Sequence, residues 1–333
     1  MKKISFALIG AGKMGTRWAF VISKCANTAL DSIVDTDLKK AKDLAEKIPH
    51  CTATSNILDV LNSKEIHAVL IATPHKYLAP ITESALKAGK HVLCEKPGAN
   101  KSEQIKNNID LAKKTRLVYK IGYNYRFHDG FIKARKLYDK GVIGDLLFIR
   151  ARHGFGGRVG YEKEWRINKD IGGGGHLHDQ GTHLIDMAKS FMGKIKKIRG
   201  IRADNFWKAG TEDNAFVLLQ DENDVIASIH SSLTQWKRMH SFEIYGTKGY
   251  LSVEGLGMRY GDGEKLIVGK RTEDPDKVKE KVIVCNPIAD NSLAYELAEF
   301  ISAIKQGTPL DPTPLDAYET LKIVEEVYKT NKL

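Results

Sequence analysis

Cysteine and long apolar runs are both scarce in this 333-residue chain. The four cysteines are scattered and form no C-x-x-C pair, which argues against a disulfide framework and against a thiolate zinc site. No stretch approaches the roughly 20 consecutive apolar residues that a membrane-spanning helix needs. We therefore expect a protein of the reducing cytoplasm with no membrane partner.

A segregated block of one charge is also missing. The formal charge is +11, but the 52 Lys and Arg residues are interspersed with 41 Asp and Glu residues, so no basic stripe indicates nucleic-acid binding. We interpret the excess as a generally basic surface that attracts an anionic small molecule. The hydrophobic content of 42% and the chain length predict a sizeable core and two domains.

The first third of the chain alternates short apolar runs with helical patterns. This alternation is typical of βαβ units, which form a parallel sheet covered by helices. We therefore predict an α/β, doubly wound Rossmann domain over residues 1–122. Its expected strands are 4–9, 32–35, 68–72, 91–94 and 117–121.

The rest of the chain has a different pattern of predicted helices and strands. Helical patterns at 131–140 and 178–191 flank a strand at 146–152 and a glycine-rich loop, and consecutive strands with short turns follow. This order predicts an α+β domain over residues 123–333 with a large, mainly antiparallel sheet. Two helices, 293–306 and 314–329, end the chain, and the pattern leaves open which domain the last one contacts.

A G-x-G-x-x-G motif follows the first expected strand and opens a helix. Its glycines permit a tight turn and close approach of a pyrophosphate, and the helix N-terminus offers free N–H groups. Asp35 lies 20 residues beyond the motif, where a carboxylate accepts hydrogen bonds from ribose hydroxyls and repels a 2′-phosphate. These residues predict NAD rather than NADP binding at Gly10, Gly12, Lys13, Met14, Gly15 and Asp35.

Two further segments carry candidate chemistry. Lys96 precedes a proline at the end of an expected strand, where an ammonium group can stabilise developing alkoxide charge. Asp179 and His183 are four residues apart on an expected helix beginning near His178, so the imidazole suits a general base beside an orienting carboxylate. A zinc site built on His176, His178 and His183 is an alternative, and we favour the reading without a metal.

Several segments together resemble the glucose-fructose oxidoreductase, inositol dehydrogenase and MocA (Gfo/Idh/MocA) family. The resemblance covers most of the chain. It is carried by Gly10 to Gly15, Ala72-Thr73-Pro74, Ala88 to Pro97 (AGKHVLCEKP), Gly122 to His128 (GYNYRFH), Trp165-Arg166 and Asp179-x-x-x-His183.

The resemblance implies catalysis on sugars, cyclitols or sugar nucleotides by Lys96, Asp179 and His183. It also implies an open-faced sheet in the second domain that mediates homodimers or homotetramers. Implied cofactor contacts are Ala72, Thr73, Glu95, Lys96, Asn124, Trp165 and Arg166, and implied substrate contacts are Arg126, His153 and Tyr161.

We therefore predict an NAD-dependent dehydrogenase that oxidises a secondary hydroxyl of a sugar. The basic loop ending at Arg158 favours a nucleotide-linked or acidic sugar as the substrate. Inositol or free-sugar dehydrogenase, and an NAD-recycling glycosidase, are alternatives within the same family. A cofactor-sensing binding protein and a zinc hydrolase are alternatives from other classes.

Overall fold

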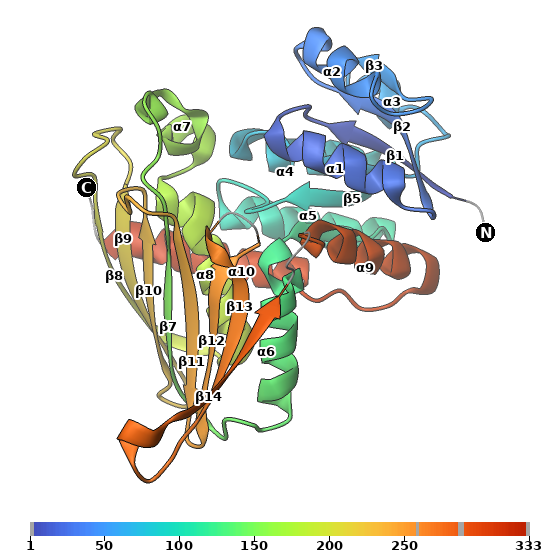
Figure 1. Ribbon diagram of the computed structural model, residues 1–333. Coiled ribbons are helices and arrows are strands. Elements are labelled where there is room, and N and C mark those ends of the chain that lie inside the picture. The colour runs from blue at the N-terminus through green and yellow to red at the C-terminus, as the bar shows by residue number, and fades with distance from the viewer. Residues whose placement is uncertain (1–2, 258–259, 286–289, 331–333) are drawn as a thin grey trace. The chain divides into compact units, whose positions relative to one another are not determined.

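The computed structural model describes residues 3–257, 260–285 and 290–330. The chain divides into two compact units (Figure 1). Unit 1 comprises the residues up to Tyr123 together with Leu293–Glu319, and unit 2 comprises Asn124–Ser292 and the residues from Thr320 onward. Among the described residues, no helix is both long and apolar enough to cross a membrane.

Unit 1 contains a six-stranded sheet in the order β3-β2-β1-β4-β5-β6, with every neighbouring pair parallel. The strand order reverses between β1 and β4, which is the point where doubly wound sheets bind ligands. The predicted Rossmann domain is therefore confirmed. The strands are β1 Ile4–Ile9, β2 Thr28–Val34, β3 Thr52–Thr54, β4 Ala68–Ile71, β5 His91–Glu95 and β6 Tyr119–Gly122.

Helices connect these parallel strands. The carboxylate of Asp37 accepts hydrogen bonds from the Lys39 and Lys40 N–H groups and so caps α2. The short strand β3 was not predicted, because its three residues carry no apolar run. The helices of this part are α1 Lys13–Lys24, α2 Leu38–Ala45, α3 Leu58–Leu61, α4 His75–Lys87 and α5 Ser102–Thr115.

Helix α9 (Ser292–Gln306) packs in the core of unit 1, although the split at residue 122 placed it in the second domain. Its side chains Leu297 and Phe300 are at most 1% exposed and join the core around β1. The ring of Phe300 lies 6.2 Å from that of Phe6. An amphipathic pattern shows that a helix has a buried face, but not which core covers it.

Unit 2 is built on an eight-stranded sheet in the order β14-β13-β12-β11-β7-β10-β9-β8. Only the β7–β10 pair is parallel among the described pairs, so the predicted mainly antiparallel sheet is confirmed. Its strands are β7 Leu146–Gly154, β8 Ile195–Ala203, β9 Asn214–Asp221, β10 Ile226–Ser232, β11 Met239–Gly246, β12 Gly249–Leu256, β13 Tyr260–Lys270 and β14 Lys279–Cys285.

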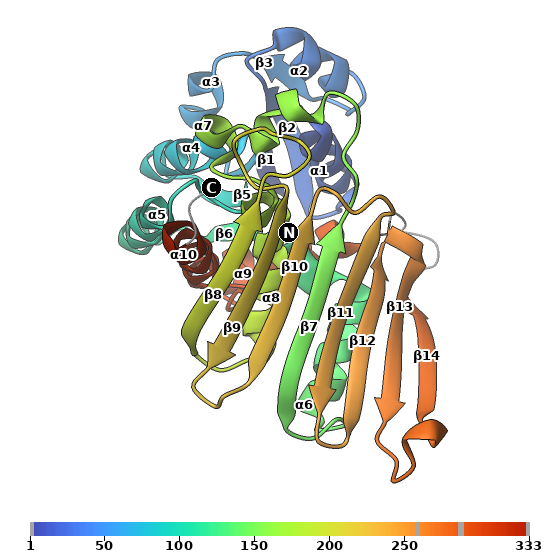
Figure 2. The same ribbon diagram turned by 90° about the vertical axis from the view of Figure 1, so that its left-hand side faces the viewer.

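Two helices, α6 (Asp129–Asp139) and α8 (Thr182–Phe191), pack on one face of this sheet. Figure 2 shows the opposite face, on which no helix of unit 2 lies in the described part of the chain. Helix α7 (Lys169–Gly172) and helix α10 (Pro314–Thr330) complete the helices, and α10 runs from unit 1 into unit 2. Short helical turns are η1 Asn124–Phe127, η2 Tyr161–Lys163, η3 Trp165–Ile167 and η5 Pro275–Lys277.

The helix that carries His183 begins differently from the prediction. A π-helical turn, η4 (Leu177–Gly181), precedes α8, so the regular helix starts at Thr182 rather than near His178. A π turn inserts an extra residue into a helix and is frequently found at functional sites. It changes the directions in which Asp179 and its neighbours point, which the assumed α-helical spacing could not anticipate.

Candidate active site

The predicted cofactor residues of unit 1 meet at the carboxyl edge of the parallel sheet. Gly10 follows β1 and donates its N–H to Val34 O on β2 at 2.7 Å, and Ala72 follows β4 and donates to Ile9 O at 2.8 Å. Asp35 and Glu95 stand at the ends of β2 and β5. Four consecutive strand ends, β2-β1-β4-β5, therefore present these residues side by side.

The glycines at this edge have distinct structural roles. Gly10 has φ +102°, and a Cβ there would lie 2.6 Å from Ala72 O. A Cβ at Gly15 would lie 1.9 Å from Gly10 O, so α1 packs directly on the turn. Beside Gly12 the space is open, and Gly12 gives α1 no side-chain cap. The start of α1 thus has no side-chain cap and has room beside Gly12, and a helix N-terminus of this kind stabilises an anion.

Two side chains at the same edge fit a dinucleotide. The buried Thr73 Oγ1 has no hydrogen-bond partner among the described residues. The Asp35 carboxylate accepts N–H bonds from Ala11 at 2.8 Å and Asp37 at 2.9 Å, which fixes it beside the glycine turn. Met14, by contrast, packs its side chain against the core, so its part in the motif is that of the backbone.

Glu95 and Lys96 follow one another at the end of β5. The Glu95 carboxylate accepts a 2.6 Å hydrogen bond from Nε1 of the buried Trp18. Desolvation raises the pKa of Glu95, and the bond from Trp18 opposes that rise. Trp18 thereby fixes Glu95, and the residue next to it in the chain is Lys96.

In unit 2, His183 lies in a stacked pair. The ring of Tyr125 is parallel to the imidazole within 7°, with the centroids 3.8 Å apart, and both residues are buried. Gln180 Nε2 donates to Asp179 Oδ2 at 3.0 Å, and the Arg166 Nε lies 3.9 Å from the same oxygen. Asp179 and His183, the two residues predicted to act together, are thus each held by neighbouring side chains. The sequence analysis did not name Tyr125 or Gln180 as site residues, and it assigned Arg166 to the cofactor.

A cluster of buried histidines lies beside this pair. His153 Nδ1 is 3.3 Å from His240 Nδ1, and the Nε2 atoms of both rings are buried without a hydrogen-bond partner in the described structure. Burial and the neighbouring imidazoles lower the pKa of His153 well below its usual value. Burial lowers the pKa of His240 to about 3. Both rings are therefore neutral at physiological pH.

The arginines assigned to the substrate are paired with carboxylates. Arg126 makes a bidentate ion pair with the buried Asp186, at 2.8 and 2.7 Å, and Arg158 pairs with Glu164. On β7, Arg150 makes a bidentate pair with Glu243 at 2.9 and 2.5 Å. Arg126, Arg150 and Arg158 therefore already have anionic partners.

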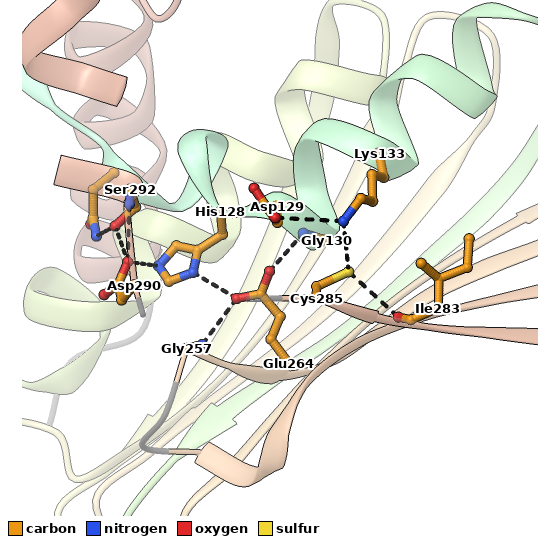
Figure 3. Close-up of polar contacts among 11 residues, drawn as sticks. His128, Asp129, Gly130, Lys133, Gly257, Glu264, Ile283, Cys285, Asp290 and Ser292 are labelled. Atoms are coloured by element: carbon orange, nitrogen blue, oxygen red, sulfur yellow. Dashed lines mark hydrogen bonds and ion pairs between the residues drawn. The ribbon is translucent and has the colours of Figure 1, made fainter. Parts of the chain in front are cut away.

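Asn124 belongs to a polar network that crosses unit 2 (Figure 3). Its Nδ2 donates to Ser292 Oγ at 3.1 Å. Ser292 in turn donates to Asp290 Oδ1 at 2.6 Å. His128 Nδ1 lies 2.7 Å from Glu264 Oε2 and its Nε2 lies 3.9 Å from Asp290 Oδ1. Glu264 also accepts the N–H groups of Gly130 and Gly257, which lowers its pKa together with the His128 bond despite burial. The network anchors η1, which carries Tyr125.

Tyr161, Trp165 and Arg166 lie in the short helical turns η2 and η3. Tyr161 is buried in a small core with Ile167 and Leu233, and the Arg166 guanidinium lies 4.5 Å from the Trp165 ring centroid. For the zinc alternative, the described residues contain no group of three or more His, Cys, Asp or Glu side chains that could hold a metal ion.

Sequence reasoning missed Glu212, which is buried beside the start of the π-helical turn η4. It accepts N–H bonds from Gly175 and Leu177 at 3.0 Å and a bond from Tyr328 Oη at 2.7 Å. The run Glu212-Asp213-Asn214, three polar residues at the beginning of a core strand, was the available signal.

Comparison with known proteins agrees with this arrangement. Residues 4–123 match the profile of an oxidoreductase family with an NAD-binding Rossmann fold, and residues 131–252 match the GFO/IDH/MocA C-terminal domain. The chain belongs to the Gfo/Idh/MocA family. It is an NAD(P)-dependent oxidoreductase acting on CH–OH groups.

Relatives cover nearly the whole chain. Levoglucosan dehydrogenase of Pseudarthrobacter phenanthrenivorans is 24% identical, over 99% of this chain and 96% of its own length. Inositol 2-dehydrogenase of Rhizobium meliloti is 25% identical over 98% and 96%. The solved structure of a levoglucosan dehydrogenase with NADH and levoglucosan superposes with a TM-score of 0.88 at 24% identity, covering 98% of each chain.

Proposed function

We propose that this protein is an NAD-dependent dehydrogenase that oxidises a secondary hydroxyl of an uncharged sugar or cyclitol. The observation that carries the choice of substrate is the pairing of the arginines in unit 2. A phosphate or carboxylate would have to replace Asp186 at Arg126, and the buried Asp186 charge left without its partner is costly. The exposed Arg158 is already paired with Glu164. The names of the relatives, levoglucosan and inositol dehydrogenases, support an uncharged substrate.

The proposed chemistry is general-base catalysis. When bound, the nicotinamide supplies the acceptor for the hydride that leaves the substrate carbon. His183 accepts the proton of the reacting hydroxyl, and its stack on Tyr125 stabilises the imidazolium that results. Lys96 donates a hydrogen bond to the oxygen and stabilises its developing negative charge. Asp179, oriented by Gln180, holds the substrate.

NAD rather than NADP is the proposed cofactor. Asp35 stands at the end of β2 with both carboxylate oxygens bonded to backbone N–H groups, so it is fixed beside the glycine turn. A 2′-phosphate next to this carboxylate would suffer like-charge repulsion. Cofactor titration by fluorescence decides the matter: NAD should bind more tightly than NADP, and Asp35→Ser should reduce that preference. Equal affinities in the native protein would contradict the assignment.

We further propose that the outer face of the eight-stranded sheet forms a homodimer or homotetramer interface. Large apolar side chains stand exposed on this sheet, including Phe148 on β7 and Phe216 and Leu218 on β9. Contiguous apolar patches of this kind mark interaction sites. Light scattering of the purified protein tests the proposal, since a monomer would exclude it.

The experiment that tests the proposed activity is a screen of NAD reduction by uncharged sugars, cyclitols, sugar acids and nucleotide sugars. We expect NADH to form with an uncharged substrate at a higher kcat/KM than with its acidic or nucleotide-linked counterpart. The reverse order would restore the anionic substrate. Release of free sugar from a glycoside without net NADH would instead identify the glycosidase alternative.

A further inference from the structure

Two exposed aromatic side chains of unit 2 have no role in the proposed chemistry. Phe206 is 55% exposed and Trp236 is 67% exposed, on the loops that follow β8 and β10. Their rings meet edge to face at 73°, with the centroids 4.9 Å apart. We refer to Phe206 and Trp236 as the aromatic pair. Large exposed aromatic surface on a rigid support usually marks a binding site.

The aromatic pair lies at the same edge of the sheet as the buried histidines. Strands β7, β8 and β10 run in one direction, so the loops after them leave the sheet together (Figure 2). His153 pairs in register with Ser231 on β10 and with His240 on β11, one residue before β7 ends. The loops of the pair therefore begin where the histidine cluster ends.

The loops are held in place by buried groups. Asp213, which is 1% exposed, accepts the N–H groups of Phe206 at 2.7 Å and of Trp207 at 3.0 Å. The Trp207 indole donates to Leu233 O at 3.0 Å. A Cβ at Gly156 would lie 2.9 Å from the Trp236 ring, so that ring packs closely on the glycine backbone. The aromatic pair is thus held in a fixed position, which lowers the entropic cost of binding a ligand.

Ring contacts connect the pair to the histidine cluster without a break. The centroids are 5.2 Å apart between Phe206 and Trp207, and 5.6 Å apart between Trp207 and Tyr161. The row continues from Tyr161 to Phe155 at 5.8 Å, from Phe155 to His176 at 5.4 Å, and from His176 to His153 at 6.0 Å. Tyr161, His176 and His153 are at most 2% exposed, so this row is packed core, and it fixes the aromatic pair rigidly beside the histidine cluster.

We infer that the aromatic pair is a second subsite, which binds the group attached to the reacting sugar, so that the substrate is a glycoside rather than a lone monosaccharide. This inference rests on the proposed sugar dehydrogenase function. Sugar rings present C–H faces that pack on aromatic rings, and a phenyl aglycone packs in the same way. A protein partner is disfavoured, because two aromatic side chains provide at most about 500 Å², below the roughly 800 Å² per partner of a stable interface.

Calorimetric titration of the NADH-loaded protein with methyl and phenyl β-D-glucoside tests the subsite. We expect the phenyl glucoside to bind roughly tenfold more tightly, and Trp236→Ala to remove most of that difference while changing methyl glucoside binding less than about twofold. Tyr295→Ala is the matched control, because its side chain is 43% exposed but lies on α9 of unit 1, and it should leave both affinities unchanged.

Equal binding of the two glucosides, binding of neither, or a preference that survives Trp236→Ala would overturn the inference. So would a change of oligomeric state in Trp236→Ala, measured by light scattering, because it would assign the pair to an interface between copies of the chain. None of these results bears on NADH formation from an uncharged monosaccharide or cyclitol, which measures the proposed function separately.

Discussion

The two units present their functional groups by different means. Unit 1 uses main chain at the ends of parallel strands: glycines that admit no Cβ, an uncapped helix start and one carboxylate fixed by N–H groups. Unit 2 uses side chains buried to within a few per cent, such as Asp179, His183 and His240, and the last two contact residues distant in the sequence. We therefore expect unit 1 to be sensitive to added side-chain volume at its glycines. Unit 2 should instead be sensitive to replacement of its buried polar side chains by groups of different chemistry.

The largest expected effect is the loss of turnover when a proposed catalytic side chain is removed. His183→Ala and Lys96→Ala should each lower kcat by about two orders of magnitude or more, because each removes a group that acts on the reacting hydroxyl. NAD affinity should remain within about threefold of the native value. Steady-state kinetics and cofactor titration measure the two quantities. Near-normal turnover in either variant would remove that residue from the mechanism.

The second prediction concerns shape in unit 1. Gly12→Ala should leave the melting temperature unchanged, because φ at Gly12 is −74° and its Cβ would meet no atom within 4 Å. The same methyl group would occupy the space beside the helix N-terminus, so NAD affinity should fall about tenfold or more. Gly15→Ala is the contrasting variant and should lose stability outright. Unchanged NAD binding in Gly12→Ala would place the pyrophosphate elsewhere.

A smaller effect is expected from the ring that stacks on His183. Tyr125→Leu removes the stack and should lower kcat/KM about tenfold, with the acid limb of its pH profile moved to lower pH, because the imidazolium loses its aromatic neighbour. Tyr125→Phe keeps the ring and should recover most of the activity. If the leucine variant changes only stability and not the pH profile, the stack is merely structural.

The smallest effect is on stability. Because the folded pKa of His240 is about 3, the unfolded chain binds a proton below about pH 6.5 that the folded protein excludes. Stability should therefore fall as the pH drops from 6.5, by about 1.4 kcal/mol per pH unit from this residue. His240→Gln should remove that contribution, so that its unfolding free energy declines by about 2 kcal/mol less than the native value between pH 7 and pH 5. Chemical denaturation at several pH values measures both slopes.

Local pattern explains why unit 1 was predictable in detail. The glycine motif and Asp35 lie within the first 35 residues, each at the end of a predicted strand, and the structure places them at one sheet edge as expected. Unit 2 depended on long-range contacts that no local pattern contains. His153 and His240 are 87 residues apart, and the carboxylate partners of Arg126 and Arg150 come from α8 and β11. For the same reason the packing of α9 in unit 1 was missed.

Isotope transfer tests the central claim most directly, namely that the protein moves a hydride from an uncharged sugar to NAD. The uncharged substrate found in the screen is prepared with deuterium on the carbon that bears the reacting hydroxyl, and the reduced cofactor is analysed by mass spectrometry. The account predicts one deuterium on the nicotinamide of every NADH formed and a slower reaction than with the unlabelled sugar. Reduced cofactor without deuterium, or sugar product formed with no reduced cofactor at all, would contradict it.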